Sequence, residues 1–335
     1  MKIRLISDLH IDINKKYPLD LHRDGLNSIY TLVAGDICGS PTMAAEWVKK
    51  NINQGALVAG NHDVYDTIMP IEEVKEFFHK EFPESGNITF FDNDVGVVSK
   101  EIADGILLVA DVMYTDYMLP ISWRNPSGDQ ARNMMLADPY MHRNGGLNDF
   151  NYGTCKKKYI GANDGRSSSI IRDDVWRLVP QWYLVHHEKA FAKITEVIES
   201  NKDKQVILMA HHGLSPQCID DNYHEDDTLD ASYVSDKEDW IKAHPNIKCI
   251  VSGHIHCRKK FKVGDCLYVM NALGYCDRHL NQYNKETGTW ESWTPHCFID
   301  TDSWTVEWQP FGNKDWEETK KRADDRFMRL APFFM

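Results

Sequence analysis

The sequence predicts an α/β fold built from parallel βαβ units. Short apolar runs that are typical of buried strands alternate with segments whose apolar residues recur at helical spacing. Several of these strands end directly in Asp, Asn or His, and the carboxyl edge of a parallel sheet is where α/β proteins bind ligands. We therefore expect an α/β domain with a polar site along one sheet edge.

Length and composition are those of a globular protein. The chain has 335 residues, which fits one large α/β domain with an insertion, and it is 42% hydrophobic and 26% charged. No apolar run approaches the ~20 residues that span a bilayer, and the first residues are charged too early for a signal peptide. We expect a cytoplasmic protein that does not contact membranes.

Cysteines and charge exclude several classes. The eight Cys are scattered without a C-x-x-C pair, which argues against zinc-finger and redox motifs and predicts reduced thiols. The net charge of -12 opposes broad binding to duplex nucleic acid, which requires Lys and Arg against many phosphates. An acidic protein that handles phosphates needs compensating positive charge, and bound metal ions can supply it.

The N-terminal part of the chain predicts alternating strands and helices. Ser40 and Pro41 are typical of an N-cap and a first helical position. Apolar residues at helical spacing predict a second helix. The expected strands are 2–7, 30–34 and 56–59, and the expected helices begin at Pro41 and cover 71–82. The segments 87–91, 95–99 and 106–109 look like three further strands that continue the sheet in antiparallel fashion.

Residues 112–180 lack core periodicity, but their aromatic and Met content argues against disorder. We expect an insertion that lies over the sheet edge and sets substrate choice, because loops on a rigid scaffold commonly carry recognition. Asn148 and Asp149 are its most site-like pair and are predicted to bind substrate. Its arginines are candidate phosphate contacts, although a surface role is favoured for any one of them. They are Arg124, Arg132 and Arg143.

The C-terminal part predicts more strands and helices. A long helix is expected over 181–200, and Ser235 and Glu238 have the spacing of a capping box that opens a short helix. Strands are expected at 205–210 and 247–251, and residues 261–310 alternate like antiparallel strands. We expect one domain over 1–312 and a helical tail over 313–335.

Five apolar strands end in residues that can bind a metal. Strand ends on one sheet edge converge in space. In extended backbone, residues two apart point to one side, so Asp8 and His10 are expected to reach one cation. Taken singly, each of these residues is an ordinary turn residue or a hydrogen-bonded histidine. The set of Asp, Asn and His without a thiolate suits Mn²⁺, Fe or Zn²⁺ and is large enough for two ions ~3.5–4 Å apart.

The ordered set resembles the signature of the calcineurin-like metallophosphoesterases. Its blocks occur in order over residues 8–256 and are Asp8-x-His10, Gly35-Asp36, Gly60-Asn61-His62-Asp63, His211-His212 and Gly253-His254-x-His256. The resemblance implies a four-layer α/β/β/α sandwich and a binuclear metal centre. We expect Mn²⁺ in that centre, with Fe or Zn²⁺ as alternatives. Weaker blocks at 109–117, 147–150, 231–236 and 271–275 are similar to those of small cytosolic phosphoesterases of bacteria and phages.

Carried over by position, the resemblance implies a role for each residue. One metal is expected between Asp8, His10, Asp36 and His256, and the other between Asp36, Asn61, His211 and His254, so that Asp36 bridges them. The resemblance favours His211 over His212, because the first His of this pair is the family's ligand. His62 is expected to contact the phosphate or the leaving group, and Asp63 to orient His62.

The predicted function is hydrolysis of phosphate esters, with phosphodiesters ahead of monoesters. A metal-bridging hydroxide is expected to attack phosphorus while His62 assists the leaving group. The substrate is expected to be a phosphate ester, with a nucleotide or nucleic-acid derivative among the options, and no protein partner is evident. The alternatives are a DNA or RNA nuclease, a protein or small-molecule phosphomonoesterase, and a catalytically inactive metal-binding scaffold.

Overall fold

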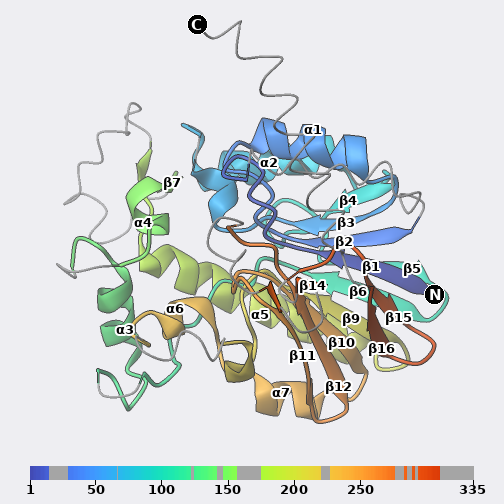
Figure 1. Ribbon diagram of the computed structural model, residues 1–335. Helices are drawn as coiled ribbons and strands as arrows, with labels where there is room; N and C mark the ends of the chain where they lie inside the picture. Colours follow the sequence, from blue (N-terminus) through green and yellow to red (C-terminus); the bar gives the residue numbers. More distant parts are fainter. Residues whose placement is uncertain are drawn as a thin grey trace, which may run out of the picture.

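The computed structural model describes residues 1–14, 29–65, 67–121, 124–141, 146–156, 175–219, 227–275, 283–284, 289–290 and 293–309. Over these residues two six-stranded sheets face each other, and helices cover their outer faces (Figure 1). The predicted tail over 313–335 lies outside the described residues. None of the helices in the described ranges is long and apolar enough to cross a bilayer.

The first sheet contains the predicted N-terminal strands. Its order is β16-β15-β1-β2-β3-β4, in which β1 to β4 are parallel and β15 and β16 add an antiparallel edge. The strand that the sequence placed at 87–91 therefore pairs in parallel with β3, and the antiparallel prediction is wrong for it. The strands are β1 Lys2–Ile6, β2 Tyr30–Ala34, β3 Gly55–Val58, β4 Ile88–Phe90, β15 Cys297–Asp300 and β16 Thr305–Trp308.

The second sheet has the order β11-β12-β10-β9-β6-β5. Its four central strands are parallel, and β5 and β11 are antiparallel edges. The strands are β5 Ser99–Ala103, β6 Ile106–Ala110, β9 Gln205–Met209, β10 Ile247–Ser252, β11 Arg258–Val263 and β12 Cys266–Asn271. A separate hairpin is formed by β13 Tyr283–Asn284 and β14 Thr289–Trp290.

Three apolar cores separate four layers. Leu5 and Leu32 of the first sheet pack with Leu108 and Ile207 of the second. The opposite face of the first sheet packs on two helices, and the opposite face of the second packs on two others. Because strand side chains alternate between faces, Ile6 belongs to the outer core next to its neighbour Leu5 in the inner one. The covering helices are α1 Pro41–Asn51 and α2 Ile71–Glu81, and α5 Pro180–Ser200 and α7 Glu238–Ala243 (Figure 1).

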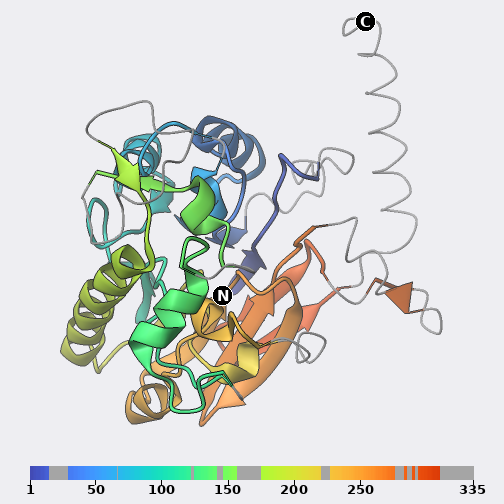
Figure 2. The ribbon, with the colours of Figure 1, turned by 90° about the vertical axis from the view of Figure 1, so that its left-hand side faces the viewer.

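The segment 112–180 contains short elements of its own, which gather with α6 on one side of the sandwich (Figure 2). Its first residues are part of the core: Tyr114 and Tyr117 are buried with Trp182 of α5. An ion pair between Arg177 and Asp138 at 3.1 Å links the middle of the segment to its end. The short elements are α3 Gln130–Ala137, α4 Asp149–Tyr152, β7 Thr154–Cys155, β8 Trp176–Arg177 and, after β9, η3 Pro216–Cys218 and α6 Asp230–Tyr233.

Two local predictions are wrong, and side-chain hydrogen bonds explain both. The strand expected at 95–99 lies at 99–103, because the Asp92 carboxylate accepts the backbone N–H groups of Asp94 and Val95 and holds a turn there. The capping box is not formed. The Ser235 hydroxyl accepts the backbone N–H of Asp116, and Glu238 accepts a hydrogen bond from Ser215 instead.

Candidate metal centre

The strand ends of both sheets meet at one edge, and their backbone is strained there. Asp8, His10, Asp36 and His254 have φ values of 53°, 41°, 54° and 66°. Non-glycine residues seldom adopt this left-handed region, and such strain clusters at functional sites. The prediction that Asp8 and His10 point to one side assumes extended backbone. That assumption is wrong, since both residues have positive φ. Backbone hydrogen bonds from Asp8 to Gly35 and from His10 to Asp36 bring the two loops together instead.

The glycines that precede the polar residues permit close approach. A Cβ on Gly60 would overlap Oδ1 of Asp36, and a Cβ on Gly253 would overlap Ser7 and Asp8. Both glycines therefore let one strand end pass directly beside the carboxylate of another.

Asp8, His10 and His256 form one cluster, in which the possible ligand atoms lie within 4.8 Å of one another. The Nε2 atoms of His10 and His256 are 3.1 Å apart, and His256 Nε2 is 3.5 Å from Asp8 Oδ1. The Asp8 carboxylate also accepts the backbone N–H of His254, so it is fixed by the opposite sheet.

Asp36, His211 and His254 form a second cluster of the same compactness. Asp36 Oδ2 is 3.5 Å from His211 Nε2 and 3.8 Å from His10 Nε2, so this oxygen lies between the two clusters. Its other oxygen accepts the backbone N–H of His62 at 2.7 Å. Asn61 Oδ1 lies 2.9 Å from His211 Nε2 and adds an amide oxygen to the second cluster. The neighbouring His212 is buried and stacks on His254 at 4.2 Å, outside the cluster.

Divalent cations fit these donors. His211 Nδ1 donates to the Ala34 carbonyl at 2.8 Å, which leaves Nε2 facing the oxygens of Asn61 and Asp36. The Asn61 and Asp36 oxygens and the lone pair on His211 Nε2 are all acceptors. Because they face one another, they need a proton or a cation between them. In the protein alone a proton takes this place: burial lowers the pKa of His211, but Asp36 and Asp8 outweigh burial and raise it to about 10. Burial also lowers the pKa of His10 and His254, which keeps these imidazoles neutral, as metal ligands must be.

His62 stands beside the clusters with a carboxylate partner that the sequence did not suggest. Its Nε2 is 3.4 Å from Asp12 Oδ2, and its ring contacts Tyr65 at 4.2 Å. Burial lowers the pKa of His62, but the hydrogen bond that its Nε2–H donates to Asp12, together with nearby carboxylates, outweighs burial and raises the pKa overall. The one sequence feature that could have indicated Asp12 is its position two residues after His10, in the run Asp8-x-His10-x-Asp12.

Asp63, which is predicted to orient His62, accepts hydrogen bonds from backbone groups. Its carboxylate accepts the N–H groups of Gly60, Ile37 and Cys38 at 2.7, 3.0 and 3.1 Å. Asp63 thereby ties the loop after β3 to the loop after β2, and the η2 turn His62–Val64 starts from this anchor.

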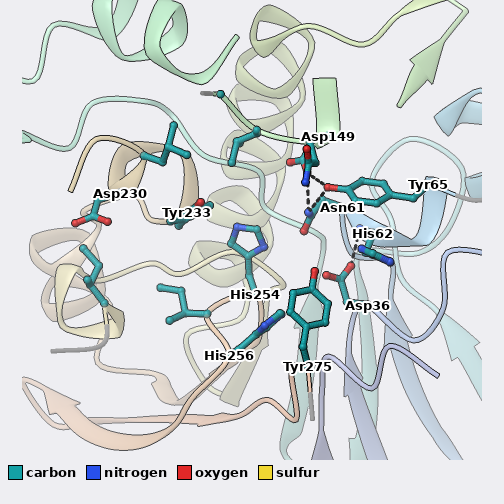
Figure 3. Close-up of a pocket in the computed structure, with 16 residues that line it drawn as sticks. Asp36, Asn61, His62, Tyr65, Asp149, Asp230, Tyr233, His254, His256 and Tyr275 are labelled. Carbon is teal, nitrogen blue, oxygen red and sulfur yellow. Dashed lines mark hydrogen bonds between the residues drawn. The ribbon is translucent and has the colours of Figure 1, made fainter. Parts of the chain in front are cut away.

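Asp149 lies in α4 and reaches the clusters through Asn61. Its Oδ1 accepts the Asn61 amide N–H at 2.9 Å and the Tyr65 hydroxyl (Figure 3). Its Oδ2 accepts the Tyr183 hydroxyl at 3.1 Å. The side chain is buried, at 2% exposure. Both carboxylate oxygens are thus engaged by protein groups. Asp149 and the neighbouring Asn148 both line a cavity.

That cavity, of about 350 Å³, lies against both clusters. Figure 3 shows Tyr65 and His62 on one side of Asp36, and Tyr233 and Asp230 on the other. Its described lining residues include no Arg or Lys. Of the predicted arginine contacts, Arg124 and Arg132 are not among these residues, and Arg143 lies outside the described chain. The tyrosines were not predicted, because no metal-type motif marks them.

Comparisons agree with this architecture. The calcineurin-like phosphoesterase family matches residues 1–258. The phosphopantetheinyl hydrolase PptH from Mycobacterium tuberculosis overlays with a TM-score of 0.58 at 16% identity, over 85% of this chain and 93% of that one, which shows the fold alone. A Staphylococcus aureus protein designated a 5'-nucleotidase overlays with a TM-score of 0.43 at 11% identity, over 97% of this chain and 58% of that one. None of the curated proteins matches the chain. With more than half of its length matched, the chain belongs to the calcineurin-like phosphoesterase family.

Proposed function

We propose that this protein is a binuclear metal-dependent hydrolase of phosphate esters that prefers phosphodiesters. The observation that carries the proposal is the position of Asp36 Oδ2, 3.5 Å from His211 Nε2 and 3.8 Å from His10 Nε2. One carboxylate oxygen shared by two ligand clusters is what a two-metal site requires. Membership of the phosphoesterase family supports phosphoester hydrolysis as the reaction class.

In this proposal every residue of the two clusters is a ligand. Asp8, His10 and His256 would hold one cation, His211, His254 and Asn61 would hold the other, and Asp36 would contribute to both sites. The hard oxygens and borderline imidazoles suit Mn²⁺, with Fe and Zn²⁺ as alternatives. Two such ions supply Lewis acidity at the phosphoryl oxygens and lower the pKa of water toward neutrality.

His62 is proposed to hold the proton that the leaving group takes. The ring lies beside Asp36, and its Nε2 faces Asp12 at 3.4 Å. A carboxylate at this distance favours the protonated imidazole and fixes its ring plane. Asp12 is therefore proposed to orient His62, while Asp63 supports it through the backbone of the same loop.

Asp149 is proposed to act on the metal centre through Asn61, and not on the substrate. An Asn side chain that donates from Nδ2 to a carboxylate must present Oδ1 on its other side, where His211 lies. A partner behind a ligand fixes the ligand's orientation and commonly affects metal affinity. Both residues line the cavity, but the Asp149 carboxylate is occupied by Asn61, Tyr65 and Tyr183, so Asn148 is the proposed substrate contact of the pair.

A panel of substrates with added Mn²⁺ tests the function. We expect higher kcat/KM for bis-p-nitrophenyl phosphate than for p-nitrophenyl phosphate, because the cavity continues on both sides of Asp36 and can receive two ester groups. Faster hydrolysis of the monoester would make the protein a phosphatase. Faster degradation of single-stranded DNA or RNA than of either compound would favour the nuclease alternative. Bound metal without turnover on the whole panel would reject the enzyme proposal.

A further inference from the structure

The side of the cavity that faces away from His62 has an apolar wall. Tyr233 lies 5.1 Å from the ring of His254, whereas Tyr65 contacts the ring of His62. Tyr233 packs against the same apolar cores as four aliphatic side chains of the cavity lining, which come from the insertion, from the loop after β9 and from the turn after β10. They are Leu147, Ile219, Leu229 and Ile255.

Two of these side chains are partly exposed, and the other two are buried in the apolar cores. Leu147 and Ile255 are 6% and 7% exposed, and Ile219 and Leu229 are half-buried at the cavity surface. Apolar surface that borders a cavity next to polar groups is typical of a ligand site, in which few polar groups fix orientation and apolar groups hold the remainder. The volume of about 350 Å³ suits a small organic group beside a phosphate.

Charge on this wall is unsuited to a second phosphate. The charged side chains among the described lining residues are Asp36, Asp149 and Asp230, all of them acidic. Asp36 belongs to the candidate metal centre, but Asp230 lies beside Tyr233 on the wall (Figure 3). An anionic group on this side would meet like charge, whereas a neutral apolar group gains from leaving water.

We infer that the substrate is a phosphodiester whose retained ester group is a neutral, apolar alkyl or aryl group that packs on this wall. The inference rests on the proposed function, since it places the phosphorus at the two clusters and the departing ester on the His62 side. The aliphatic wall, on the His254 side, then holds the group that stays on phosphorus.

Alkyl p-nitrophenyl phosphates test this separately from the chemistry. Water adds its oxygen to phosphorus and the bond to the aryl oxygen breaks, giving p-nitrophenolate, an alkyl phosphate and one proton. The leaving group is the same throughout the series, and only the retained alkyl group grows from methyl to butyl. A fully buried methylene would raise kcat/KM by about fourfold, the equivalent of ~0.8 kcal/mol. We expect at least about a tenfold rise from methyl to butyl.

A polar ester of the same length separates apolar contact from size. The 2-methoxyethyl ester matches butyl in length but contains an ether oxygen, so its kcat/KM should stay well below that of the butyl ester. Equal rates for the butyl and methoxyethyl esters would overturn the inference, as would a flat or falling series. With either result, the observed hydrolysis of the esters would still support the proposed function. Metal-loaded protein that hydrolyses none of these esters would instead reject the proposed function.

A matched pair of variants locates the contact. Ile219→Ala should reduce the gain from methyl to butyl by about fivefold, and Ile68→Ala, at a position 69% exposed and outside the lining, should keep the wild-type gain. If Ile219→Ala and a second wall variant, Leu229→Ala, both kept the wild-type rise in kcat/KM from the methyl to the butyl ester, the alkyl group would bind elsewhere. That result would overturn the inference. The wild-type ester series decides the question even if a wall variant fails to fold.

Discussion

Asp149 determines which way the Asn61 side chain points. The amide Nδ2 donates to Asp149 at 2.9 Å, and the amide oxygen therefore faces His211 Nε2, also at 2.9 Å. Asp149 belongs to the segment 112–180, so this segment supports the candidate metal centre directly in addition to lining the cavity.

Asp149→Ala should weaken binding of the second cation by ~10–100-fold, the usual effect of losing the partner behind a ligand. Asp149→Asn keeps an acceptor for the Asn61 amide and should lose less. Asn148→Ala, one residue earlier, should retain wild-type metal affinity. Competition with a chelating dye measures all three. Unchanged metal affinity in Asp149→Ala, together with activity lost on one substrate only, would return Asp149 to substrate binding.

His62→Ala should keep its metal content and lose ~10²–10⁴-fold in kcat for an alkyl leaving group, the usual size of a general acid term. The loss should be much smaller for p-nitrophenolate, which needs little protonation. Asp12→Asn should show the same dependence on leaving group with a smaller loss, because Asp12 contacts His62 without touching the clusters described here. Equal losses for both leaving groups would show that His62 positions the phosphate and donates no proton.

His187 should make the fold sensitive to mild acid. It is 2% exposed and bonded to the Tyr114 carbonyl, and burial, with a smaller effect of Lys237, lowers its pKa to about 4. The unfolded chain protonates this histidine near its ordinary pKa of about 6.5, so its stabilisation is complete above that pH and is lost as pH falls toward 4. The contribution is ~3 kcal/mol.

Urea unfolding of metal-free protein between pH 7.5 and 4.5 measures this contribution. The free energy of unfolding should fall more steeply in the wild type than in His187→Phe, which cannot take up the proton. Parallel curves for the two proteins would assign the acid sensitivity to other groups.

Much of the candidate site follows from the sequence, because a polar residue directly after a buried strand must lie at the sheet edge. This local rule brings Asp36 and His211 together although they are far apart in the chain. The reason for placing Asp8 beside His10 was wrong, since both residues have positive φ and not extended backbone. Their convergence depends on hydrogen bonds to a neighbouring loop, which no local pattern reveals.

The partners behind the site depend on tertiary structure. Asp149 meets Asn61 only after a long segment has folded back over the first sheet, and Tyr183 joins them from α5. In the same way, the displacement of β5 to 99–103 follows from one Asp92 side chain that holds a turn. Strand periodicity predicts the parallel strands of the core. It predicts neither the hydrogen bond between Asp149 and Asn61 nor the turn that Asp92 holds.

The central claim is that two cations bridged by Asp36 carry out phosphodiester hydrolysis. Metal-free protein can be titrated with Mn²⁺ while bound metal and hydrolysis of bis-p-nitrophenyl phosphate are measured in the same sample. Activity should rise with occupancy and saturate at about two ions per chain. Asp36→Asn should bind neither ion tightly and stay inactive, and Asp302→Asn, at a side chain 86% exposed, should behave as the wild type. Full activity with one ion, or full occupancy in Asp36→Asn, would contradict the account.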